Sequence, residues 1–136
     1  MDVNFQLLPI DGEIVIVEDD VLLLGLMKDI LLDVGAQCVA FSTADDALIH
    51  MLGSDTRCAL MIVDHGVPGQ VQGAELAELV KHKWPETRII ITSGWTQTFI
   101  GIPAGTAFLP KPWSLEELVR AVANQLQPGV PPDRNI

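Results

Sequence analysis

The chain has 136 residues, of which 49% are hydrophobic, and its 18 acidic and 8 basic side chains give a formal net charge of −10. This length suits one domain with a hydrophobic core. The excess of acids argues against direct binding to nucleic acid, whose phosphates need a basic surface. No apolar run approaches the roughly 18 residues of a membrane helix, so we expect no membrane contact.

The N-terminus lacks the basic start and small-residue cleavage site of a secretory signal, so we expect a cytoplasmic protein. The two cysteines, Cys38 and Cys58, have no zinc-type spacing and fall in strand-like stretches. Free cysteine in such a setting behaves as a small apolar residue, so both are predicted to be reduced and buried.

Short β-branched runs alternate with segments of helical periodicity along the chain. The run Ile14–Val17 is typical of a buried parallel strand, and apolar residues then recur at helical spacing across Asp20–Val34. The alternation continues with a strand at Ala36–Ser42, a helix at Thr43–Leu52, a strand at Cys58–Asp64, a helix at Ala74–Trp84, and strands at Arg88–Gly94 and Thr106–Pro112. Ser114 opens a last helix, because its spacing to Glu117 fits a capping box.

Strands that alternate with helices predict an α/β domain, with a parallel sheet covered on both faces. We expect one domain over residues 13–127, an N-terminal extension over residues 1–12 and a frayed tail over residues 128–136. The segment 95–107 carries Gly101, Pro103 and Gly105 and leaves room for only a short helix.

Charged and hydroxyl side chains follow the predicted strands where each one ends. Ligands of an open α/β sheet bind outside these carboxyl ends, so the side chains should meet at one edge. They are Glu18, Asp19 and Asp20 after the first strand, Asp64 at the third, Thr92 or Ser93 at the fourth and Lys111 at the fifth.

This set of side chains indicates a magnesium and phosphoryl site. Asp19 and Asp64 suit direct coordination of Mg²⁺, with Glu18 acting through water and a backbone carbonyl beyond Asp64 completing the set. A carboxylate can also accept a phosphoryl group, whose other oxygens Lys111 and a hydroxyl would stabilise. Acids after a strand also occur as a solvated helix N-terminus, and for Asp20 we favour that role.

Four motifs carry a family resemblance: "IVIVEDD", "LMIVDHGVPG", "IIITSG" and "FLPKPW". In their order and approximate spacing the chain resembles a response-regulator receiver domain over residues 13–127. The resemblance implies a flavodoxin-like (βα)5 fold, a doubly wound five-stranded parallel sheet with strand order 2-1-3-4-5. It also implies a stand-alone phosphoacceptor of a two-component phosphorelay, which is not an enzyme beyond phosphorylating itself and slowly reversing that step.

The resemblance further implies roles for individual residues at the metal. Asp64 would be the phosphoacceptor and a ligand of Mg²⁺. Asp19 would coordinate the ion directly, Glu18 would assist, and Gly66 would contribute its main-chain carbonyl. The loop after Asp64 departs from the family, because the interval from Pro68 to Gly73 is one residue longer than usual.

A second group of implied roles concerns the phosphorylated state. Lys111 would pair with the phosphoryl group, with a cis bond to Pro112, and Ser93 would supply the switch hydroxyl. Phe108 occupies the aromatic switch position. Trp95 lies where the family's side chain influences hydrolysis of the acyl phosphate.

The implied partner is a sensor histidine kinase or a histidine phosphotransfer protein. The downstream partner stays open, as does the choice between a phosphate sink and an output regulator. A monomer is favoured over a dimer, because the segment before the fifth strand is short. The alternative function is a pseudo-receiver, a constitutive protein-interaction domain without phosphorylation. A flavodoxin-like cofactor binder is disfavoured, because carboxylates replace the phosphate-cradling turn after the first strand.

Overall fold

A computed structural model describes residues 5–66, 72–94 and 104–133 of the chain. The strands of this part are β1 (Glu13–Val17), β2 (Cys38–Phe41), β3 (Cys58–Asp64), β4 (Arg88–Ser93) and β5 (Ala107–Pro110). Its helices are α1 (Val21–Asp33), α2 (Ala44–Gly53), α3 (Gly73–Lys83) and α4 (Leu115–Leu126). All paired strands are parallel, in the order β2-β1-β3-β4-β5, which confirms the predicted fold.

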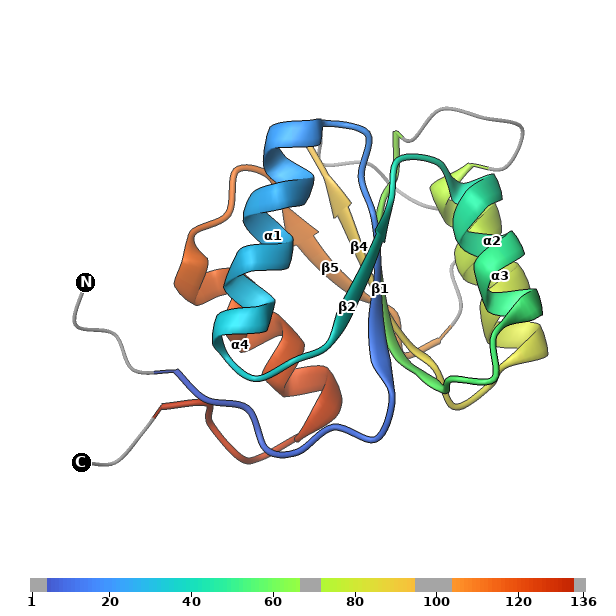
Figure 1. Cartoon of the computed structure of the whole chain (residues 1–136). Helices are drawn as coiled ribbons and strands as arrows, with labels where there is room; N and C mark the ends of the chain where they lie inside the picture. The colour runs from blue at the N-terminus through green and yellow to red at the C-terminus, as the bar shows by residue number, and fades with distance from the viewer. Residues whose placement is uncertain (1–4, 67–71, 95–103, 134–136) are drawn as a thin grey trace.

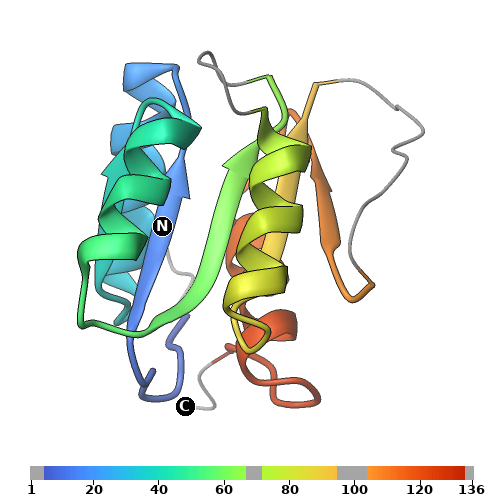
Figure 2. The same ribbon diagram turned by 90° about the vertical axis from the view of Figure 1, so that its right-hand side faces the viewer.

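The helices form two layers, with α1 and α4 on one face of the sheet and α2 and α3 on the other (Figures 1 and 2). Successive strand residues point to opposite faces, so β1 feeds both cores. Ile14 and Ile16 pack under α1 and α4, whereas Val15 and Val17 pack under α2 and α3. Burial on both faces explains why the central strands read as continuous apolar runs.

Helices α1, α2 and α4 each begin directly after a residue whose side chain caps the helix. Asp20 caps α1 through its side-chain oxygen, which accepts from the N–H groups of Leu22 and Leu23. Thr43 caps α2, and Ser114 caps α4 in the predicted capping box. The predicted place of Asp20 at a helix N-terminus is therefore confirmed, and the structure makes it the N-cap.

The differences from the predicted elements concern edges and ends. Strands β2 and β5 are shorter than predicted, because each has only one neighbouring strand to define its length. The short helix expected in the segment 95–107 falls largely on residues 95–103, outside the described part of the chain. None of the described helices is long and apolar enough to cross a membrane.

The two cysteines are unpaired. Cys58 is buried as predicted, and burial raises the pKa of its thiol to about 12. Cys38 is only half-buried, because β2 lies at the edge of the sheet, and burial raises the pKa of its thiol to about 11.

The described part of the C-terminal tail differs from the frayed segment expected there. Phe5 and Leu7 are buried in the core under α1 and α4, and a bridge joins Phe5 to Asp133. The N–H of Gln6 donates to the carbonyl of Pro132 at 2.9 Å. Pro132 and Asp133 therefore lie against the N-terminal segment, which gives them backbone partners that no local pattern reveals.

Candidate phosphoacceptor site

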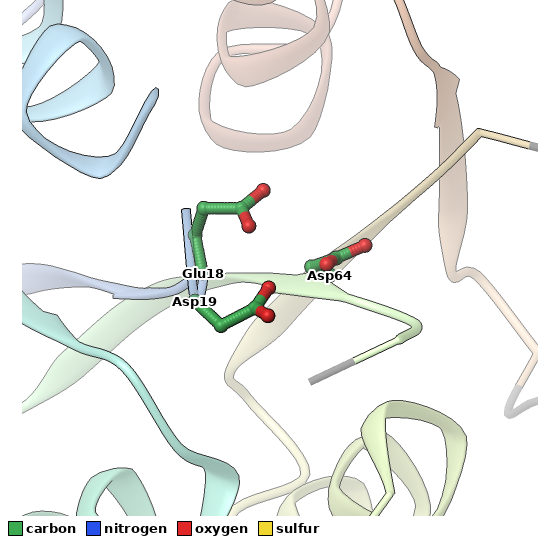
Figure 3. A group of neighbouring side chains, drawn as sticks. All are labelled: Glu18, Asp19 and Asp64. Atoms are coloured by element: carbon green, nitrogen blue, oxygen red, sulfur yellow. The ribbon is translucent and has the colours of Figure 1, made fainter. Parts of the chain in front are cut away.

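The site lies at the carboxyl edge of the sheet, where β1 and β3 end side by side. The register pairs Val17 with Val63, so the next residues, Glu18 and Asp64, emerge next to each other. One carboxylate oxygen from each of Glu18, Asp19 and Asp64 lies within 4.8 Å of the others. Figure 3 shows the three side chains converging from two strand ends. The sequence prediction that they meet is confirmed.

Lys111 reaches this cluster from β5. Its backbone N–H donates to the Ser93 carbonyl at 2.8 Å, which continues the β4–β5 pairing by one residue. Its Nζ lies 2.6 Å from Oε1 of Glu18 and 3.4 Å from Oδ1 of Asp64. Three separate strands therefore bring one cation and the carboxylates together.

The electrostatics of the cluster follow from burial. Glu18 is only 1% exposed, and burial raises its pKa above the usual value, although hydrogen bonds from Lys111 and the Asp20 N–H oppose the shift. Burial alone lowers the pKa of Lys111, but its bonds and charge interactions with Glu18 and Asp64 outweigh this and raise it. The lysine thus supplies the positive charge that makes adjacent acids tolerable here.

The donor set fits a hard divalent cation. Mg²⁺ prefers carboxylate and carbonyl oxygens, and it is usually held by one or two carboxylates together with water. Asp19 is exposed and Asp64 lies at the edge, so both can offer oxygen ligands. Both oxygens of Glu18 already accept hydrogen bonds, from Lys111 and from the Asp20 N–H. Glu18 therefore suits an assisting role.

Gly66, the predicted backbone ligand, lies beside Asp64. A Cβ placed on Gly66 would lie 3.9 Å from Oδ2 of Asp64, so this glycine's backbone is close to the carboxylate. The neighbouring His65 donates its N–H to the Thr92 carbonyl at 2.9 Å. The backbone of Gly66 therefore lies near the Asp64 carboxylate, and its role as a metal ligand stays a prediction.

The remaining predicted residues occupy different positions around the cluster. Ser93 and Thr92 are both buried at the end of β4, and Thr92 is the register partner of Asp64. Phe108 on β5 is 42% exposed. The Lys111-Pro112 bond is cis, as expected from the resemblance. Trp95 lies outside the described residues.

Sequence reasoning missed two contacts of the site. It assigned Lys111 to the phosphoryl group alone, whereas here the ammonium bonds Glu18. It also missed Gly73, whose backbone lies against that of Asp64. The available signal for Gly73 was a glycine at a helix start after a loop rich in glycine and proline, which marks a place where backbones approach closely.

A family model described as the response regulator receiver domain matches residues 14–123, most of the chain. The chain belongs to this receiver family. No curated protein matches it, but solved receiver domains do.

Three solved structures illustrate the shared receiver fold. A CheY-like receiver domain from Methanospirillum hungatei JF-1 is 25% identical with a TM-score of 0.76, covering 85% of this chain and 93% of that one. One from Clostridium thermocellum is 21% identical with a TM-score of 0.73, covering 85% and 94%. The BeF3-activated receiver domain of DrrB is 23% identical with a TM-score of 0.73, covering 87% and 99%. These likenesses support the receiver fold.

Proposed function

We propose that this receiver domain is a Mg²⁺-dependent phosphoacceptor. It takes a phosphoryl group from a phosphohistidine of a sensor kinase or a phosphotransfer protein onto Asp64. The observation that carries the proposal is the cluster of Glu18, Asp19 and Asp64, with oxygens within 4.8 Å, beside the ammonium of Lys111. An acceptor, metal ligands and a cation for phosphoryl oxygens are the parts that such a transfer needs.

The transfer is a substitution at phosphorus. A carboxylate oxygen of Asp64 forms the new O–P bond while the P–N bond to the donor histidine breaks, and its electron pair stays on the imidazole nitrogen. Asp19, Asp64 and the Gly66 carbonyl would hold Mg²⁺, with Glu18 assisting, and the ion would supply charge neutralisation for the phosphoryl oxygens. Lys111, 3.4 Å from Asp64, pairs with another of those oxygens.

The output of the phosphorylated state is a change of partner preference. Ser93 at the end of β4 offers the switch hydroxyl, and Phe108 offers an aromatic side chain that is 42% exposed in this structure. A new charge on Asp64 biases the position of both, which is how a local electrostatic event changes a binding face. The domain catalyses nothing beyond its own phosphorylation and slow dephosphorylation, and it works in the cytoplasm.

The test is a titration of Mg²⁺ with and without beryllofluoride, a phosphoryl mimic, followed by tryptophan fluorescence, to which Trp113, two residues beyond Lys111, contributes. Wild type is compared with Asp64→Asn and with a control, Asp29→Asn. The control makes the same carboxylate-to-amide change at an exposed position of α1. We expect a Mg²⁺-dependent beryllofluoride response in wild type and Asp29→Asn and none in Asp64→Asn. Acetyl phosphate should phosphorylate the same two proteins, as measured by intact mass.

A folded wild-type chain that shows neither response contradicts the proposal. That result supports the alternative function, a pseudo-receiver that binds partners constitutively. A response retained in Asp64→Asn contradicts the assignment of the acceptor residue.

A further inference from the structure

The first turn of α3 is packed against the backbone of Asp64. Gly73, the first residue of α3, is buried, and a Cβ placed on it would lie 2.6 Å from the Asp64 carbonyl oxygen. The same Cβ would lie 2.9 Å from the Cα of His65. Both neighbours are backbone atoms, so no side chain can rotate away to make room. Only the hydrogen of glycine fits this contact.

The opposite side of the same peptide is held by β4. The N–H of His65 donates to the Thr92 carbonyl at 2.9 Å, and Asp64 itself is the register partner of Thr92. The peptide that joins Asp64 to His65 therefore lies between a strand and a helix start. The contact with α3 and the hydrogen bond to β4 together restrict where the residue that carries the acceptor carboxylate can lie.

The start of α3 is itself fixed by local bonds. The N–H of Leu76 donates to the Gln72 carbonyl at 2.9 Å, and the N–H of Gln72 donates to a Glu75 side-chain oxygen at 3.4 Å. The chain that leaves Asp64 thus returns to contact it at Gly73. The additional residue between Pro68 and Gly73 does not separate the helix start from the acceptor.

We propose that Gly73 is a positioning residue for phosphoryl transfer, which fixes the backbone of Asp64 and thereby the place of its carboxylate. This inference rests on the proposed function of Asp64 as the acceptor. Gly25 offers a matched contrast, because it also lies in a helix, α1, and a Cβ placed on it would meet nothing within 4 Å. The two glycines differ in what surrounds them and receive the same substitution.

The experiment compares Gly73→Ala with Gly25→Ala and wild type. The rate constant of phosphorylation by acetyl phosphate at saturating Mg²⁺ is measured well below each melting midpoint, where circular dichroism shows a folded chain. We expect Gly73→Ala to react about 10- to 100-fold more slowly, because a misplacement of roughly 1 Å costs that much in a transfer reaction. Gly25→Ala should react at the wild-type rate. The amide shift of His65 in a nitrogen–proton spectrum should move only in Gly73→Ala.

The outcomes separate this inference from the proposed function. Wild type that neither responds to beryllofluoride nor reacts with acetyl phosphate refutes the proposed function, and the inference falls with it. A folded Gly73→Ala that reacts at the wild-type rate, while wild type behaves as proposed, overturns the inference alone. Gly73→Ala is also made together with Gly25→Ala, which favours the helix. If that double variant is unfolded too, Gly73 serves folding and the positioning role is overturned.

Discussion

Lys111 and Arg120 each lie between two carboxylates, in regions of the molecule that differ in burial. At the carboxyl edge of the sheet Lys111 contacts Glu18 and Asp64, and beside the chain termini Arg120 contacts Glu116 and Asp133. The side chains of Lys111 and Glu18 are 24% and 2% exposed, whereas those of Arg120 and Asp133 are 41% and 49% exposed. The shortest contacts, 2.6 and 2.9 Å, are similar.

The two regions differ in how well water can reach the charged groups and take the place of a lost ion-pair partner. Water solvates the exposed charges of the terminal pair, so losing one partner costs little. Glu18 has almost no access to water, and its carboxylate depends on Lys111, a backbone N–H and, in the proposed function, a metal ion. A similar arrangement of charges therefore contributes little to stability where water reaches it and much more where it is buried.

The largest expected effect is that of Lys111→Ala. Removing the cation leaves Glu18 beside Asp64 without its strongest partner, so we expect the free energy of unfolding to fall by about 2 kcal/mol in EDTA. Mg²⁺ should restore more stability in this variant than in wild type, because the ion replaces lost positive charge. Urea denaturation with and without Mg²⁺ measures both effects. Lys28→Ala, at an exposed position of α1, serves as the control, and an equal loss there contradicts the prediction.

Asp20→Ala should have the next largest effect. Comparing it with Asp19→Ala distinguishes the helix cap from the neighbouring metal ligand of the proposed site. Asp20 caps α1, so its loss should lower the free energy of unfolding by about 1 kcal/mol and leave Mg²⁺ affinity nearly unchanged. Asp19→Ala should do the reverse, since its oxygen belongs to the cluster. Thermal melts and a Mg²⁺ titration of each variant distinguish the two. Equal losses of Mg²⁺ affinity would show that Asp20 is also a ligand.

A smaller effect is expected in the pH dependence of stability. The folded chain holds the Glu18 proton more tightly than the unfolded chain does, because burial raises the pKa above the ordinary 4.5. Stability due to protonated Glu18 is therefore complete below that value and declines as the pH rises through the raised pKa. Relative to Glu18→Gln, wild type should lose stability over this window in EDTA. Parallel curves for the two proteins would argue against a raised pKa.

The smallest effect is expected for Arg120→Ala. Its ion pairs are exposed, so the urea midpoint should shift far less than for Lys111→Ala, and added NaCl at about 0.5 M should shrink the shift further. Part of any remaining loss comes from the contact between the guanidinium and the Phe5 ring, at 5.7 Å. A salt-insensitive loss as large as that of Lys111→Ala would erase the contrast between the two regions.

How far the sequence predicted the fold depended on where each element lies. The predicted strand Cys58–Asp64 matches β3 at both ends, because every residue of β3 is buried and the apolar run is continuous. The edge strand β2 is shorter than its prediction, since its residues are only half-buried and pairing with β1 sets its length. The packing of Phe5 into the core leaves no local signal, because it depends on residues far along the chain.

The sequence by itself determined the α/β class, the helix starts at Asp20 and Ser114, and the convergence of carboxylates and a lysine on one edge. These follow from hydrophobic periodicity, capping chemistry and the rule that parallel strands end together. Only the tertiary structure decided that Lys111 pairs with Glu18 and that Gly73 contacts the Asp64 backbone. The physical reason is that burial and close approach arise between elements distant along the chain, and no local pattern records them.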